Sequence, residues 1–277
     1  MNTSSMAQTG RSNAGRAARG SVTEGAARAG FTARGVIYLL VGVLALQIAF
    51  GEGEHQADRG GALAAVADKP FGSVILWALG IGLVGMALWR LSEVLFGAVG
   101  PDGRKAGKRA LSAVRCVFYS FVAYSVLSFA VGTGSGGSSD KQSKDITARA
   151  LGVTGGQWLV GAAGVGVAAA GVWIAVQAVR RSFHDKLKLA EMGPRIRKLV
   201  DVTGVGGGVA RGAVFAAAGV SAVRAAVDYE PKKVKGLDDT LRSFSDTPLG
   251  PWLLVCVAAG FVLFGVFSFA MARWRRV

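Results

Sequence analysis

The sequence predicts an all-α polytopic membrane protein, with six transmembrane helices arranged as three parallel two-helix repeats that could pack as a pseudo-threefold bundle. Three observations carry this prediction: the composition, the lengths of the apolar stretches and the distribution of basic residues between them. Hydrophobic residues make up 51% of the 277 residues and charged residues only 18%, whereas a typical soluble domain has roughly 25% charged residues. The composition therefore indicates a membrane protein.

Six apolar stretches are each about 20 residues or longer, the length that spans a hydrocarbon core of about 30 Å. They cover residues 31–50, 71–96, 110–131, 156–179, 208–227 and 249–271. Residues 1–25 are polar and rich in Gly, Ala, Ser and Arg, which predicts a disordered cytoplasmic tail. Their basic character also fits a mitochondrial transit peptide, and that alternative stays open. The glycine-rich string at 204–208 predicts a flexible linker.

The basic residues alternate in density between the two sides of the predicted membrane. The segments up to Arg34, at 97–109, at 180–207 and after Met271 hold 5, 4, 7 and 3 Lys and Arg residues, whereas the three intervening loops hold 2, 3 and 4. By the positive-inside rule the first group of segments is cytoplasmic. The sequence therefore predicts a multi-pass protein of the bacterial inner membrane with both termini in the cytoplasm.

The chain contains three copies of a two-helix unit, over residues 26–97, 109–183 and 208–277. The first helix of each unit carries an arginine in a similar string: Ala33-Arg34-Gly35, Val114-Arg115-Cys116 and Ala210-Arg211-Gly212. The second helix begins at a matching glycine: Pro70-Phe71-Gly72, Thr154-Gly155-Gly156 and Pro248-Leu249-Gly250. Because each unit has an even number of helices, all copies share one orientation, unlike the inverted repeats of many transporters.

Small residues recur at four-residue spacing in several of the apolar stretches, as Ala78/Gly82, Gly164/Ala168 and Gly208/Gly212. Such pairs allow helix backbones to approach closely in lipid. They predict tight helix packing within the bundle.

Three strings carry a family resemblance: Ala33-Arg34-Gly35-Val36-Ile37-Tyr38, Pro70-Phe71-Gly72 and Leu88-Trp89-Arg90. They resemble the bacterial domain-of-unknown-function 1206 family, over 26–276 of this chain. The resemblance implies a six-helix membrane protein with three copies of the unit, of a kind found widely in actinobacteria. It is weakest in repeat two, where Cys116 and Thr154-Gly155-Gly156 depart from the pattern. The family name implies no activity.

The three repeat arginines, Arg34, Arg115 and Arg211, are predicted at one depth, about a turn inside the cytoplasmic surface. If they face the bundle axis, their planar donor forks suit an anion or a phospholipid headgroup. The alternative is that each snorkels to the headgroups and fixes the depth of its helix. Arg90 and Glu93 are three residues apart on one helix face, which predicts an intramembrane ion pair or part of an ion path.

No catalytic or metal-binding pattern appears in the sequence. His55 and His184 fall in loops predicted on opposite faces, and Cys116 and Cys256 both lie in apolar stretches, so neither pair suits a metal site. Acids of the outer loops are predicted to be scattered solvated charges: Asp58, Asp68, Asp238, Asp239 and Asp246. We therefore expect no metal, no cofactor and no enzymatic activity.

The leading expectation is a membrane scaffold or an interaction module for lipids or proteins. Its expected partners are the bilayer and anionic lipid at the cytoplasmic face, because basic loops attract such lipid. The basic residues behind the formal charge of +15 lie between apolar stretches, where they set the membrane topology. Nucleic acid is therefore not expected as a partner. The alternative is a small transporter or channel with an arginine-lined site for an anion or lipid headgroup. An intramembrane enzyme is a third, weaker reading.

Overall fold

The computed structural model describes residues 3–50, 56–97, 105–133, 139–245 and 250–276, and its elements in these ranges are all helices. The long helices are α1 (Thr3–Ala49), α3 (Gly72–Phe96), α4 (Ala106–Ala130), α6 (Gly156–Val179), α7 (Pro194–Val227) and α9 (Gly250–Trp274). Each contains a stretch long and apolar enough to cross a membrane. The predicted all-α, six-span membrane architecture is therefore confirmed.

Two segments that were expected to be irregular are helical instead. α1 begins at Thr3, so most of the tail predicted to be disordered over 1–25 belongs to this helix. Ala and Arg are strong helix formers, and a helix already nucleated in the apolar segment extends at little cost. α7 begins at Pro194, so the expected linker at 204–208 lies inside a helix. There the glycines admit a neighbouring backbone, since a Cβ on Gly207 would lie 2.5 Å from the Phe264 nitrogen.

A short helix precedes the second long helix of each repeat: α2 (Arg59–Ala67), α5 (Ser139–Leu151) and α8 (Leu237–Ser245). This arrangement explains the glycine that recurs where the second helix begins. A Cβ on Gly72 would lie 2.1 Å from the Val66 carbonyl oxygen, and one on Gly156 would lie 1.7 Å from that of Ala150. The chain reverses so tightly against the end of the short helix that only glycine fits.

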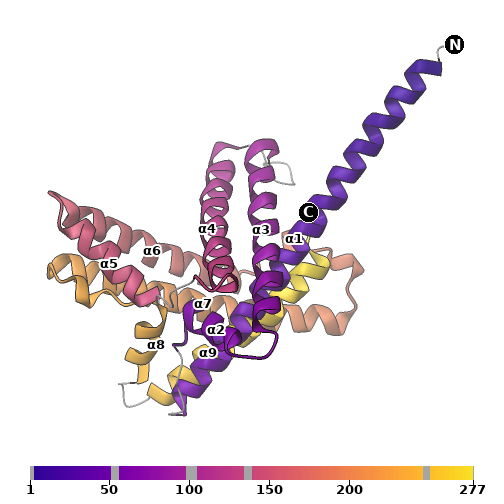
Figure 1. Ribbon diagram of the computed structural model, residues 1–277. Coiled ribbons are helices and arrows are strands. Elements are labelled where there is room, and N and C mark those ends of the chain that lie inside the picture. Colours follow the sequence, from indigo (N-terminus) through magenta and orange to yellow (C-terminus); the bar gives the residue numbers. More distant parts are fainter. Residues whose placement is uncertain (1–2, 51–55, 98–104, 134–138, 246–249, 277) are drawn as a thin grey trace.

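The helices pack in pairs that join one repeat to the next: α3 with α4, α6 with α7, and α9 with α1. Two further contacts, of α1 with α3 and of α7 with α9, close repeats one and three. Figure 1 shows the α3–α4 and α6–α7 pairs diverging from the α1–α9 pair. In the part of the chain that the structure describes, α4 and α6 do not pack side by side. The six helices therefore follow a threefold order that is open at repeat two.

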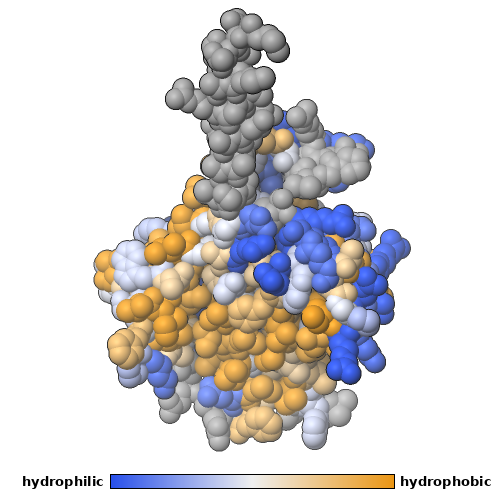
Figure 2. Space-filling view, turned by 90° about the vertical axis from the view of Figure 1, so that its right-hand side faces the viewer, coloured by the Kyte–Doolittle hydropathy of each residue, from blue (hydrophilic) through white to orange (hydrophobic). Residues whose placement is uncertain are grey.

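The two ends of the bundle differ in character. We call the end where α3 and α6 finish and α4 and α7 begin the basic end, and the end that carries α2, α5 and α8 the cap end. The 3-10 helices η1 (His184–Lys186) and η2 (Leu189–Glu191) lie at the basic end, and η3 (Pro231–Lys233) lies at the cap end. Figure 2 shows an apolar band across the body of the molecule, with hydrophilic residues gathered beyond it. Such a band is what a bilayer-spanning surface requires.

Candidate functional site

A cavity of about 560 Å³ lies between the α3–α4 and α6–α7 pairs, against α1. We call it the central cavity. Its walls are mainly aliphatic and aromatic and come from five of the long helices: Ile37, Val41, Leu83, Phe118, Val122, Ala163 and Val214. It extends along α7 from Arg211 to Ala222, which is about 16 Å at about 1.5 Å per residue. Such a mostly apolar lining with a few polar groups is typical of ligand sites.

The central cavity opens sideways between α4 and α6. Phe118 of α4 and Leu159 of α6 both line it, yet 52% and 64% of their surfaces are exposed. Val167, about two α6 turns from Leu159, lines the cavity and is 39% exposed as well. Residues that belong to both a cavity wall and the outer surface mark an opening. Because α4 and α6 span the membrane, this opening faces lipid.

Arg34 and Arg211 mark the basic end of the cavity. Their Cζ atoms lie 5.1 and 5.0 Å from the centroid of the same aromatic ring, that of Phe264. Arg34 Nε donates a hydrogen bond to Ser268 Oγ at 3.1 Å, whereas Arg211 Nε is buried without a hydrogen-bond partner. Among the described residues no carboxylate pairs with either guanidinium. Two like charges thus share one end of an apolar cavity, uncompensated.

The third repeat arginine, Arg115, is not part of the cavity lining. The groups that act on its charge are Arg90 and Glu93 of α3, together with Tyr119 and Arg211 of the cavity lining. This follows from the pairing of the helices, because α4 packs against α3 and α3 carries Arg90 and Glu93. The structure therefore brings two of the three predicted arginines together at the cavity and places the third beside it, in the repeat whose sequence departs most from the pattern.

Arg90 and Glu93 form an ion pair on α3, with Arg90 Nη1 donating to Glu93 Oε2 at 2.6 Å. Both residues are buried, and Ser112 Oγ of α4 donates a second hydrogen bond to the same carboxylate oxygen at 3.0 Å. The Arg90 guanidinium stacks on Trp89, 4.1 Å from the ring centroid. Pairing and stacking together reduce the cost of both charges inside the helix bundle.

The cap end of the cavity is also basic. Arg59 and Lys235 line it, together with the hydroxyl groups of Ser143 and Thr147. Burial lowers the pKa of Arg59 from its ordinary value, and the nearby Asp58 carboxylate acts against this shift. The Arg59 Cζ lies 5.5 Å from the centroid of the Phe121 ring of α4.

Two acids of the outer loops are buried, so their prediction as solvated charges was wrong. Asp58 has none of its surface exposed, and its side chain accepts a hydrogen bond from the Gly61 amide at 2.8 Å. Asp238 accepts from the Ala57 amide at 2.7 Å and from Arg242 Nε at 2.8 Å. Their position just before or within the short cap helices was the signal, because Asp is a favoured helix cap. Asp246, His55, Pro248 and Leu249 lie outside the described residues.

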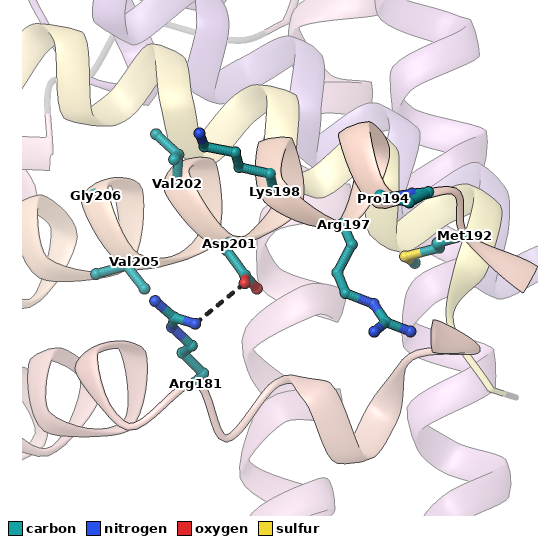
Figure 3. A pocket seen from close by; sticks show the side chains of 9 residues that line it. All are labelled: Arg181, Met192, Pro194, Arg197, Lys198, Asp201, Val202, Val205 and Gly206. Atoms are coloured by element: carbon teal, nitrogen blue, oxygen red, sulfur yellow. Dashed lines mark hydrogen bonds and ion pairs between the residues drawn. The ribbon is translucent and has the colours of Figure 1, made fainter. Parts of the chain in front are cut away.

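A second hollow, of about 790 Å³, runs along the first turns of α7 at the basic end. Figure 3 shows Arg181 and Asp201 pointing toward each other across it, with Arg181 Nη1 3.3 Å from Asp201 Oδ2. His184 Nε2 lies 2.5 Å from the other oxygen of Asp201, and Arg197 donates to the Leu189 carbonyl at 2.9 Å. These groups satisfy one another. This surface hollow therefore has less need of a ligand than the central cavity.

The model of one protein family matches the chain three times, over residues 29–97, 111–181 and 206–275. Its description is Domain of Unknown Function (DUF1206). The chain is also 29% identical over 243 residues to the uncharacterized protein YxxB of Bacillus subtilis (strain 168), an alignment that covers 87% of each chain. No solved structure matches it. The three matches coincide with three tandem repeats, which confirms their prediction from sequence.

Proposed function

Because the chain belongs to the DUF1206 family, whose description names no activity, we propose its function from its own geometry: it binds an amphipathic anionic lipid in the central cavity. It acts there as a non-enzymatic module for lipid interaction. The observation that carries this proposal is the pair of uncompensated arginines, Arg34 and Arg211, at one end of an apolar cavity that opens to the bilayer.

The charge of the cavity calls for an anionic partner. A charged side chain within a membrane helix is costly and is usually paired, most simply with a carboxylate. Here both guanidiniums contact the Phe264 ring, but no described carboxylate joins them. Arg211 Nε is left without a partner. A lipid phosphate would supply acceptor oxygens for both forks, and charge-assisted hydrogen bonds of this kind are the strong ones.

The remainder of the cavity suits the tail of the same molecule. Each methylene moved into an apolar site gains about 0.8 kcal/mol relative to water, but a lipid tail leaves an equally apolar bilayer. The tail therefore fits without cost, and the headgroup supplies the selectivity. The side opening bordered by Phe118 and Leu159 lets a lipid enter without leaving the membrane.

The orientation follows from the distribution of charge. We place the basic end at the cytoplasmic face of a bacterial inner membrane, since the segments at this end hold most of the Lys and Arg residues. Arg34 and Arg211 would then lie near the cytoplasmic leaflet, whose anionic lipids attract basic groups.

Lipid analysis of the purified protein tests the proposal. The variant Arg34→Gln/Arg211→Gln removes both cavity charges, and Arg180→Gln/Arg195→Gln removes two exposed charges at the same end. Protein from native membranes should retain anionic lipid through detergent washing, as measured by mass spectrometry. The cavity variant should lose it, and the control should keep it. Equal retention by both variants would refute the cavity as the site.

The cap end of the cavity supports a second candidate function, transport of an anion or lipid headgroup between the two ends. Arg59 and Lys235 line that end, so cationic groups stand at both extremes of one cavity. Reconstituted vesicles with a fluorescent anionic lipid in one leaflet would detect transfer. For a transport function, the protein should move the labelled lipid between leaflets, and Arg59→Gln should slow this movement. Protein that binds lipid but leaves the leaflet distribution unchanged has the binding function alone.

A further inference from the structure

A second group of cations lies at the basic end, outside the central cavity. Four positively charged side chains converge there from four parts of the chain: Arg90 of α3, Arg115 of α4, Lys186 of η1 and Arg275 after α9. The carboxylate among them is that of Glu93, which is already paired with Arg90. We call this group the basic-end cluster. With one acid against four bases among the residues that the structure describes, it carries an excess of three positive charges.

Aromatic rings hold two of the guanidiniums in place. The Arg275 Cζ lies 5.0 Å from the Phe31 ring centroid and 4.8 Å from that of Trp89. Arg90 stacks on the same Trp89 ring at 4.1 Å. Phe31 and Trp89 are themselves buried and in contact, with ring centroids 5.6 Å apart. Stacking occupies the faces of the guanidiniums and leaves their N–H edges to donate elsewhere.

Those edges are satisfied only in part within the described part of the protein, where Arg90 Nη1 donates to Glu93. Arg90 Nε and Arg275 Nε are both buried and have no hydrogen-bond partner. Arg90 itself is only 5% exposed. Buried donors without an acceptor are rare, and each one calls for an explanation such as a bound ion.

Backbone hydrogen bonds hold Lys186 and Arg275 close together. Leu187 and Arg275 form an isolated antiparallel bridge, in which the Lys188 amide donates to the Trp274 carbonyl and the Arg276 amide to the Lys186 carbonyl, each at 2.9 Å. Lys186 and Arg275 therefore stay adjacent despite their repulsion. Partial desolvation, followed by repulsion from Arg275, Arg115 and Arg90, lowers the pKa of Lys186 to about 8. Burial lowers that of Arg275 to about 9.

We infer that the basic-end cluster is a binding site for a phosphomonoester anion, held by Arg275, Arg115 and Lys186 beside the Phe31 and Trp89 rings. A phosphomonoester carries roughly 1.5 to 2 negative charges at neutral pH and three acceptor oxygens, which match the excess charge and the free donors. The same chemistry occurs in free phosphate and in a lipid such as phosphatidic acid. This site shares no ligand-holding residue with the central cavity, so it does not depend on the proposed function.

Binding at this site should be coupled to a proton. Lys186 faces Arg275 after α9, Arg115 of α4, and Arg90 and Glu93 of α3. An anion placed among them favours the charged form of Lys186 and raises its pKa. Affinity should therefore fall as the pH rises from 7.5 to 9, a range in which the phosphomonoester, with a second pKa of about 6, stays fully charged.

Calorimetric titration of the full-length protein in neutral detergent tests the site. The probes are inorganic phosphate and a short-chain phosphatidic acid, with the matching phosphatidylcholine as the uncharged control. Arg275→Gln should weaken binding by about tenfold or more, whereas Arg273→Gln, an exposed arginine of the same segment, should leave it unchanged. Lys186→Met should make the decline between pH 7.5 and 9 shallower.

The probes separate the two sources of the ligand. Saturation by inorganic phosphate alone identifies a soluble phosphate, and saturation by phosphatidic acid only identifies a lipid headgroup. Lys186 is exposed, so Lys186→Met should fold normally. This variant tests the site even if Arg275→Gln does not fold. The proposal is overturned if neither probe binds, or if Arg273→Gln and Arg275→Gln weaken binding equally. A decline with pH that persists unchanged in Lys186→Met would remove the proton coupling.

Discussion

Replacing Gly171 by alanine would put a methyl group inside the contact between α6 and α7, the helices that form one wall of the central cavity. A Cβ at this position would lie 2.4 Å from the Ala216 amide nitrogen and 2.6 Å from the Gly212 carbonyl oxygen. Carbon atoms in favourable contact are about 3.5–4.0 Å apart, so the two helices must separate by about 1 Å. Both obstructing atoms belong to a helix backbone and cannot rotate away.

The energetic effect has two opposing parts. Forcing an extra methyl into a packed contact costs about 1–3 kcal/mol, whereas exchanging glycine for alanine within a helix gains about 1 kcal/mol. Gly166 lies on the same helix, and a Cβ there would meet nothing within 4 Å. Gly166→Ala should therefore gain helix propensity without any loss in packing. The two variants should differ by the packing term alone, about 1–3 kcal/mol.

Thermal unfolding in detergent measures this difference. For chains of this size class a change of 1 kcal/mol moves the Tm by about 2–4 °C, so Gly171→Ala should unfold roughly 2–12 °C below Gly166→Ala. The comparison uses one helix, one substitution type and one detergent. A Gly171→Ala protein that melts at or above the temperature of Gly166→Ala would refute the close contact of α6 with α7.

Three further predictions concern the turn before α6, the Arg90–Glu93 ion pair and a hydrogen bond at the cap end. Gly155 has a φ of 81° and open space around its Cβ position, so Gly155→Ala should cost about 1–2 kcal/mol from the left-handed backbone alone, whereas Gly152→Ala should not lower the Tm. Glu93→Gln should destabilise the protein by about 3–5 kcal/mol because it leaves Arg90 buried and unpaired. The double variant Arg90→Met/Glu93→Gln should have a higher Tm than Glu93→Gln alone. An equal or lower Tm would argue against the pairing. Tyr229→Phe removes the hydrogen bond from Tyr229 Oη to the Leu151 carbonyl at 2.7 Å and should cost about 0.5–1.5 kcal/mol. Tyr124→Phe, at a tyrosine that is 74% exposed, is its control and should have no effect on the melting temperature.

The small-residue pairs show how far sequence spacing can be taken. Gly164 and Ala168 do meet a neighbouring backbone, because a Cβ on Gly219 of α7 would lie 2.3 Å from the Ala168 nitrogen. Likewise, a Cβ on Gly82 would lie 2.9 Å from the Ala29 carbonyl oxygen of α1. The spacing predicted that a close approach would occur on these helix faces. It could not predict which helix would approach, since a small residue admits any partner of suitable shape.

The candidate site was predictable only in part. The three repeat arginines were visible because each interrupts an apolar stretch at the same place in its unit. That Arg34 and Arg211 share a cavity while Arg115 joins Arg90 and Glu93 depends on α4 packing against α3. Arg275 and Lys186 gave no sequence signal beyond their charge, because a backbone bridge between distant segments places them together.

The sequence alone determined the number of membrane spans, the repeat and the alternation of basic loops, since length, hydropathy and local charge are properties of short segments. The tertiary structure decided which helices pair, where the ring of helices stays open and which charges lack a partner. The physical reason is that all six helices are similarly apolar, so the bilayer does not favour one pairing over another. Steric fit between small residues from distant parts of the chain makes that choice, and the central cavity follows from it.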